Sequence, residues 1–225
     1  MAEWFTAVGT IFLGVVALFV ALFQEHVRRF MFKPKLGVLG SNFHPYCLKE
    51  GWMREGVSFV NRPHYRLRIG VVNNGNTKAE SVQIFAKKLE RQDGHGLYVR
   101  VSPFIERYVL WSDAESQTLD VLNPGFTAYA HLGNVFSTTD VPDNVRALAE
   151  SVREGNLGTR TVLSLFPSGS WGQLFAPGKY QLTVIIGAAN ADLIEKILEV
   201  DLTGNWPGVE IGPERVGEIV KFGVL

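Results

Sequence analysis

The sequence predicts a mainly β protein, in which an antiparallel β-sandwich follows one N-terminal transmembrane α-helix. Two patterns carry this prediction: an uncharged apolar run over residues 4–23, and an alternation of apolar and polar residues after residue 35. The third observation is composition, since the 225 residues carry 22 Lys+Arg and 22 Asp+Glu and are 46% hydrophobic. This composition excludes a disordered chain and a general nucleic-acid coat, which requires a basic excess.

Residues 4–23 form twenty consecutive residues without a charge, WFTAVGTIFLGVVALFVALF. A helix of about 20 residues, at about 1.5 Å per residue, spans the roughly 30 Å hydrocarbon core of a bilayer. A cleaved signal peptide and a buried core helix are the alternatives. A signal peptide carries its positive charges before the apolar run. Here Glu3 precedes the run, and the basic residues follow it, at Arg28, Arg29, Lys33 and Lys35. We therefore expect a membrane helix.

The same basic residues predict the orientation of the helix, because Lys and Arg close to a helix end stay on the cytoplasmic side. The N-terminus is expected outside, and the chain after Phe23 in the cytosol. Trp4 at one end and the four basic residues at the other are expected at the two membrane interfaces. The predicted location is therefore the cytoplasmic membrane, as a single-pass protein in contact with the lipid bilayer.

Five small residues recur at helical spacing along this run: Ala7, Thr10, Gly14, Ala17 and Ala21. Spacings of 3, 4, 3 and 4 place them on one face of a helix, which we call the small-residue seam. Small residues let helix backbones approach closely in lipid. Chance is the alternative, because seven of the twenty residues are Gly, Ala or Thr. We expect the seam to mediate homo-oligomerisation and, with several copies, to line a narrow pore.

Apolar and polar residues alternate in five later segments: 65–71, 82–86, 126–132, 180–186 and 194–202. Such segments predict strands with one buried face, and about eight or nine short strands favour a sandwich. Turn residues separate them, at Asn73-Asn74-Gly75-Asn76, Asn123-Pro124-Gly125, Pro167-Ser168-Gly169 and Pro177-Gly178. One soluble helix is expected over residues 143–154, after Pro142.

These elements divide the chain into three parts. Residues 1–33 are expected to form the transmembrane helix with a basic collar, and residues 34–205 the cytosolic β-sandwich. Residues 206–225 carry an amphipathic stretch and are expected to dock on the sandwich or on a neighbouring subunit.

Four stretches carry a resemblance to known proteins: FKPKL, YRLRIGVVNNGNTKAESVQIFAKKLE, VLNPGF and APGKYQLTVIIGAANADLIEKILEVDLTGNW. With the basic-flanked anchor, they resemble a group of bacterial single-pass membrane proteins over most of the chain. The resemblance implies an N-terminal membrane helix that carries a cytosolic immunoglobulin-like sandwich. Its motifs are strand ends and hairpin turns, which identify a fold and not a chemistry. By analogy with comparable small anchored proteins, it implies a membrane effector in bacterial antiphage defence.

The sequence carries no complete catalytic or metal-binding motif. One cysteine excludes an intrachain disulfide, and none of the five histidines forms a His-Glu-x-x-His pair. His44 and Cys47 lie three residues apart without a second pair, which favours a turn with a buried cysteine over a metal site. We therefore expect no enzymatic activity, no catalytic residue, no metal and no cofactor.

Charge is unevenly distributed along the neutral chain. Residues 62–107 carry nine Lys/Arg and four Asp/Glu, whereas residues 108–154 carry two and seven. The candidate contact residues in the basic part are Arg66, Arg68, Lys87 and Lys88. They indicate a solvated sheet face, a surface for a nucleotide-type anionic ligand, or a head-to-tail subunit contact.

Two functional hypotheses follow. The first is a homo-oligomeric membrane effector, in which the sandwich controls assembly or gating of an ion channel or pore built from the helices. The second is a membrane-tethered binding or adaptor module, in which the helix is an anchor and the sandwich recruits a cytosolic protein or an anionic ligand.

Overall fold

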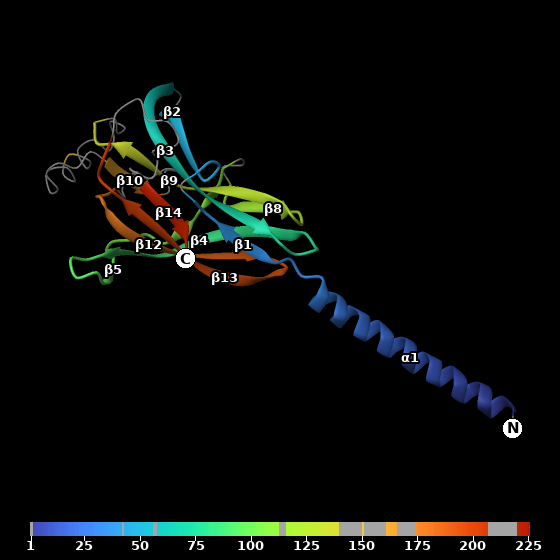
Figure 1. The fold of residues 1–225 in the computed structure, drawn as a ribbon. Coiled ribbons are helices and arrows are strands. Elements are labelled where there is room, and N and C mark those ends of the chain that lie inside the picture. Colours follow the sequence, from blue (N-terminus) through green and yellow to red (C-terminus); the bar gives the residue numbers. More distant parts are fainter. Residues whose placement is uncertain are drawn as a thin grey trace.

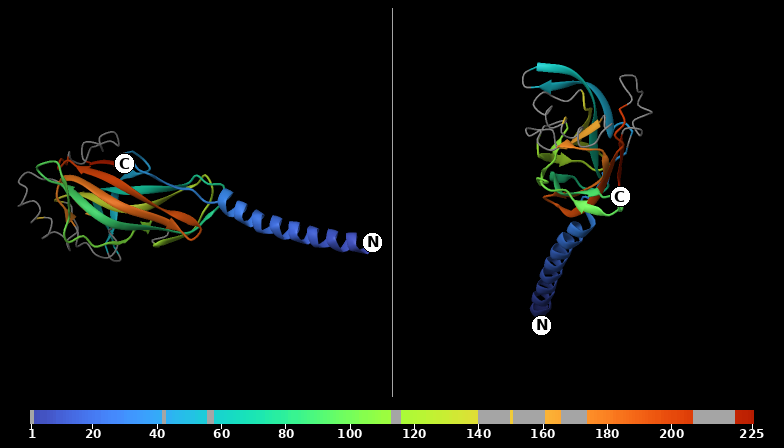
Figure 2. Two further views of the ribbon diagram at one scale, coloured as in Figure 1. Left: turned by 90° about the horizontal axis from the view of Figure 1, so that it is seen from below. Right: turned by 90° about the vertical axis from the view of Figure 1, so that its left-hand side faces the viewer.

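A computed structural model of the protein describes residues 2–41, 43–55, 58–112, 116–139, 150, 161–165, 174–206 and 220–225. Within them, the side chains of residues 2–8, 25–31, 51–63 and 162 fall outside the description. A long helix, α1 (Ala2–Met31), precedes a β-rich domain. Figures 1 and 2 show α1 pointing away from this domain, with the N-terminus at its far end.

The described strands form two antiparallel seven-stranded sheets, which we call sheet A and sheet B. Sheet A contains β1 (Leu36–Leu39), β2 (Cys47–Glu55), β3 (Ser58–Asn73), β7 (Leu110–Trp111), β9 (Thr127–Ser137), β10 (Thr161–Leu165) and β11 (Leu174–Phe175). Sheet B contains β4 (Ala79–Gln92), β5 (Tyr98–Arg100), β6 (Arg107–Tyr108), β8 (Thr118–Leu122), β12 (Gly178–Ala188), β13 (Ala191–Leu202) and β14 (Val220–Val224). The prediction of a mainly β, antiparallel protein is confirmed, with fourteen described strands instead of eight or nine.

The alternating residues of β3, β4 and β12 form a common core between the sheets. The side chains with 2% exposure or less include Tyr65, Leu67, Ile69, Val71, Val82, Ile84, Ala86, Tyr180, Leu182, Val184 and Ile186. Trp111 of sheet A also lies in this core and donates its indole N–H to the carbonyl of Val82 in sheet B at 3.2 Å. The predicted buried faces of these strands are therefore confirmed, because period-2 apolar residues all point to one side of a strand.

Phe126 departs from the expected pattern. The alternation predicts that it is buried with Ala130 and Leu132, but its side chain is 66% exposed. The reason is that β9 begins at Thr127, so Phe126 belongs to the turn before the strand.

The end of the C-terminal segment belongs to sheet B. Strand β14 pairs with β13 in antiparallel register, and Val220 and Phe222 are buried. Residues 207–219, the expected helix over residues 143–154 except residue 150, and the expected turn at 167–169 lie outside the described residues.

The side chain of Asn73, at the end of β3, joins the linker after α1 to both sheets. It is fully buried, and its Oδ1 accepts hydrogen bonds from the backbone N–H groups of Lys35 (3.2 Å) and Gly75 (3.0 Å). Its Nδ2 donates to the carbonyls of Thr77 (2.7 Å) and Leu122 (3.0 Å). An amide has two donor hydrogens and two acceptor lone pairs, so these four contacts use its full capacity.

The linker is also held directly by the turn between β3 and β4. The N–H of Asn74 donates to the carbonyl of Lys35 at 2.7 Å, and the hydroxyl of Thr77 donates to the carbonyl of Phe32 at 2.9 Å. A Cβ on Gly75 would lie 2.6 Å from linker backbone atoms, so glycine is required for this approach. We call this set of contacts the α1 junction.

We expect Asn73→Ala to destabilise the fold by about 3 kcal/mol or more, because it leaves buried backbone groups without partners. Asn76→Ala is the matched control: Asn76 is exposed in the same turn, and its replacement should cost less than about 0.5 kcal/mol. Denaturant unfolding of the full-length protein in detergent measures both. Equal stability of the two variants would contradict the role of Asn73.

Candidate functional site: an exposed apolar helix joined to the sandwich

The described side chains of α1, residues 9–24, are all exposed. Ten large apolar side chains have exposed fractions from 42% to 69%: Ile11, Phe12, Leu13, Val15, Val16, Leu18, Phe19, Val20, Leu22 and Phe23. They occupy ten of the thirteen positions from 11 to 23, which span more than three helical turns, so large apolar side chains cover most of the circumference of the helix. In the part of the chain that the structure describes, no helix meets the combined length and apolarity required of a membrane span.

Four of the five seam residues, Thr10, Gly14, Ala17 and Ala21, lie among these exposed residues. The side chain of Ala7 lies outside the described residues. The helical geometry places the four described residues along one face, as the spacing predicts. A Cβ added at Gly14 or at Gly9 would meet no atom within 4 Å, so the two positions offer equal room within one chain.

The expected interface residues are described in part. The side chains of Trp4, Arg28 and Arg29 fall outside the description. Lys33 forms an exposed ion pair with Asp192 of β13, with Nζ 3.3 Å from Oδ1. Lys35 has an exposed side chain, and its backbone belongs to the α1 junction.

The four basic candidate residues do not come together. Arg66 and Arg68 lie on β3 in sheet A, whereas Lys87 and Lys88 lie on β4 in sheet B. The two strands follow one another in the sequence, but the turn at residues 74–78 carries the chain from one sheet to the other.

Each of these four side chains has a partner within the chain. Arg66 pairs with Glu50 at 2.8 Å, and Lys87 and Lys88 pair with Glu195 and Glu90, each at 2.9 Å. Arg68 donates from Nε and Nη2 to the carbonyl of Pro45 and lies over the ring of Tyr129. An anionic ligand would have to displace these partners. Five of the seven acidic residues in the acidic part of the chain, residues 108–154, lie outside the described residues.

Glu50, Arg66 and two histidines form a titratable cluster on sheet A. Burial raises the pKa of the Glu50 carboxyl, but the neighbouring His64 and Arg66 outweigh it, so this pKa is below its ordinary value. Burial, together with the positive charge of Arg66, lowers the pKa of His131 to about 4. His131 contacts Asn134, with Nε2 2.9 Å from Oδ1. This pattern is that of a neutral, structural histidine beside an ion pair.

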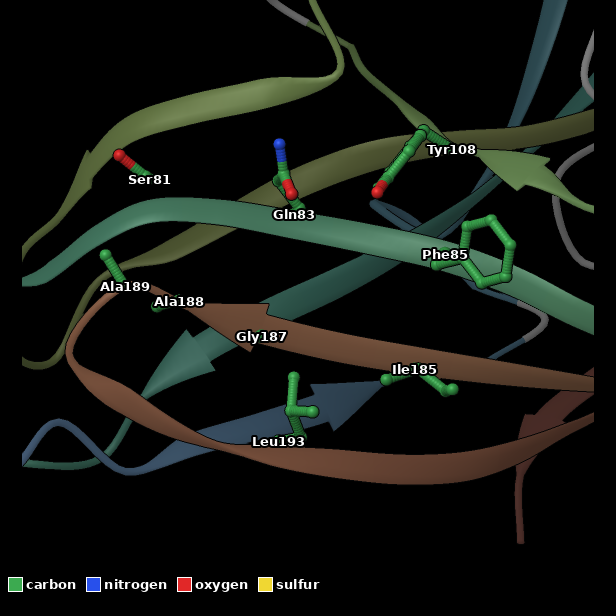
Figure 3. A pocket seen from close by; sticks show the side chains of 9 residues that line it. All are labelled: Ser81, Gln83, Phe85, Tyr108, Ile185, Gly187, Ala188, Ala189 and Leu193. Carbon is green, nitrogen blue, oxygen red and sulfur yellow. The ribbon is translucent and has the colours of Figure 1, made fainter.

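A groove of about 410 Å³ lies on the outer face of sheet B (Figure 3). Phe85 and Tyr108 form one end of it, with ring centroids 5.2 Å apart in an edge-to-face arrangement. Ile185 and Leu193 add apolar surface, and Gln83 adds a polar group that donates to Thr118 Oγ1 at 2.8 Å. This lining suits an apolar or aromatic group better than an anion.

Sequence reasoning missed the groove, Asn73 and Phe126. The alternation places Phe85 on the outward face of β4, and an outward aromatic residue was the available signal for the groove. For Phe126 the available signal was its place directly after Asn123-Pro124-Gly125, because residues in turns lie at the protein surface.

Cys47 is buried, as expected, and burial raises the pKa of its thiol to about 12. In the described part of the chain, no three His, Cys, Asp or Glu residues are grouped so that they could hold a metal ion.

Comparison of the sequence with protein-family models and with curated proteins finds no match.

The His131 environment predicts a loss of stability in acid. Its pKa is 6.5 in the unfolded chain and about 4 in the fold, so the unfolded state takes up the proton first as the pH falls. Between pH 7.5 and pH 5 this lowers the free energy of unfolding by about 2 kcal/mol. His131→Gln should remove that part of the loss, as measured by denaturant unfolding at both pH values. An unchanged acid loss in the variant would contradict the assignment.

Proposed function

We propose that the protein is a single-pass membrane protein that self-associates through α1, with its sandwich controlling the assembly or gating of a channel or pore. In this proposal α1 spans the cytoplasmic membrane with the N-terminus outside. The immunoglobulin-like assignment of the sandwich, and the role in antiphage defence that the resemblance implies, are part of the same proposal.

The exposure of α1 is the observation that carries the proposal. Ten consecutive or near-consecutive large apolar side chains are exposed around the helix between Ile11 and Phe23. Burying a fully exposed Val, Leu, Ile or Phe side chain yields about 1.5–3 kcal/mol, and these ten side chains are 42% to 69% exposed, so together they yield roughly 10–20 kcal/mol. A transfer free energy of this size favours an apolar environment for α1 over water. The uncharged run over residues 4–23 is long enough for that environment to be the bilayer core.

The small-residue seam supports self-association within the bilayer. In lipid, apolar surface alone gives no preference for helix contact, so close backbone packing and polar contacts decide it. Thr10, Gly14, Ala17 and Ala21 give one face of α1 a low profile, whereas Phe12 and Phe19 lie outside this face. Bundled helices that share this face would surround a narrow path with Thr10 as its mid-membrane hydroxyl.

Gly14→Leu should lower the number of subunits in the assembly, because a leucine side chain on the seam separates the helix backbones. Gly9→Leu is the matched control, since Gly9 has equal open space but lies off the seam. Light scattering of the full-length protein in detergent gives the subunit count. We expect an assembly for the parent and for Gly9→Leu and a smaller species for Gly14→Leu. The same count in all three would contradict the seam.

A channel predicts K⁺ flux through liposomes that contain the full-length protein. We expect Gly14→Leu to reduce the flux at least about tenfold and Gly9→Leu to leave it near the parent value, because conduction requires the assembled helices. A K⁺-selective electrode outside K⁺-loaded vesicles measures the efflux. An assembled parent protein without efflux would contradict the channel while leaving membrane anchoring intact.

The second candidate is a membrane-tethered binding module, which the groove on sheet B favours. Its apolar and aromatic lining, with Phe85, Tyr108 and Ile185, points to a partner with an apolar group. An anionic ligand is less favoured, since the basic candidate residues already have partners. A tethered module predicts no K⁺ efflux and no effect of Gly14→Leu, so the two experiments above distinguish the candidates.

A further inference from the structure

Two exposed apolar side chains of the sandwich lie at the end from which α1 leaves. Phe126, in the turn between β8 and β9, is 66% exposed, and Leu193, near the start of β13, is 74% exposed. Figure 1 shows that the turns from β3 to β4, β8 to β9 and β12 to β13 gather at this end, and Figure 2 shows the same end from two other sides. Phe32, directly after α1, is 49% exposed.

The backbone at Phe126 and the residue next to Leu193 are each connected to the base of α1 by hydrogen bonds or an ion pair. The carbonyl of Phe126 accepts a hydrogen bond from the N–H of Asn73 at 3.1 Å, and Asn73 Oδ1 binds the N–H of Lys35 at 3.2 Å. Leu193 follows Asp192, whose carboxylate pairs with Lys33 at 3.3 Å. The backbone of Phe126 and the residue before Leu193 are therefore connected to the linker after α1, and the side chain of Leu193 also lines the groove on sheet B.

The turn that carries Phe126 has a fixed backbone. Gly125 has a φ of +75°, its N–H donates to the carbonyl of Asn73 at 2.8 Å, and the N–H of Phe126 donates to the carbonyl of Asn123 at 3.2 Å. An aromatic side chain is thus presented to solvent by an ordered turn. Aromatic and aliphatic side chains beside lysines are typical of the zone between lipid headgroups and acyl chains.

We propose that this end of the sandwich rests on the bilayer, with Phe126 and Leu193 inserted into its interface as a second membrane contact beside α1. The inference rests on the proposed function, because the bilayer lies at this end of the sandwich if α1 spans it. The occupant of the surface is lipid, because Phe126 and Leu193 are exposed at the end of the sandwich from which the exposed apolar surface of α1 leaves, and Phe32, the first residue after α1, is exposed as well. The contact fixes the height and tilt of the sandwich relative to the membrane.

Fluorescence quenching by lipid tests this contact in the full-length protein. In a Cys47→Ala background, single cysteines replace Phe126, Leu193, Leu97 or Phe19 and are labelled with an environment-sensitive nitrobenzoxadiazole dye. The proteins are reconstituted in phosphatidylcholine vesicles with and without a lipid that carries a nitroxide near the headgroup end of its acyl chain. Leu97 is the matched control: it is 67% exposed, close to the 66% of Phe126, and it lies in the turn between β4 and β5, at the end remote from α1.

We expect the nitroxide lipid to reduce fluorescence at positions 126 and 193 by about twofold and to leave position 97 unchanged. Phe19 reports on α1 itself and should also be quenched. If the dye at position 19 is quenched while the dyes at positions 126 and 193 remain unquenched, as at position 97, the interfacial contact is wrong. The insertion of α1 in the bilayer would then still be supported. A dye at position 126 that shifts to the blue without lipid quenching would indicate a second copy at this surface, which also overturns the proposal. A Phe19 dye that lipid does not quench would overturn the proposed function.

Discussion

The buried amide of Asn73 is the contact on which the arrangement of helix and sandwich depends. Its side chain makes four hydrogen bonds, to the linker after α1, to the β3–β4 turn and to the end of β8. Its backbone makes two more, with Gly125 and Phe126 of the β8–β9 turn. Removal of the side-chain amide would leave the backbone groups of Lys35, Gly75, Thr77 and Leu122 without this partner, whereas the two backbone bonds would remain. One residue, through its side chain and its backbone, therefore connects the base of α1 with two turns of the sandwich.

The α1 junction determines where the exposed apolar surface of α1 lies relative to the sandwich. A flexible linker would let an apolar helix dock anywhere, whereas here Gly75 admits the linker against the turn and Thr77 holds its carbonyl at Phe32. The apolar surface from Ile11 to Phe23 thus leaves the sandwich at a defined end. If lipid covers that surface, the same end of the sandwich faces the membrane.

Local patterns in the sequence predicted the faces of the strands but not their partners. The alternation in β3 and β12 identified core residues such as Leu67 and Leu182, because the side-chain period of a strand is a local property. The turn at Asn73 was also predicted, but its contacts with Lys35 and Leu122 join residues 38 and 49 positions apart. The same turn carries the chain between sheets, which separated Lys87 from Arg66 although their strands are consecutive. Contacts between residues distant in the sequence, and the assignment of strands to sheets, leave no periodic pattern of apolar residues from which they could be predicted.

The most direct test of the central claim is a map of lipid and water contact along α1 in the bilayer. Spin labels placed one at a time at residues 9–24 of the full-length protein report collisions with oxygen, which enters lipid, and with a water-soluble nickel complex. We predict low nickel contact at the positions off the seam, and minima of oxygen contact that recur at Thr10, Gly14, Ala17 and Ala21. High nickel contact on all faces of the middle of α1 would contradict a membrane-spanning helix, and uniform oxygen contact around it would contradict assembly through the seam.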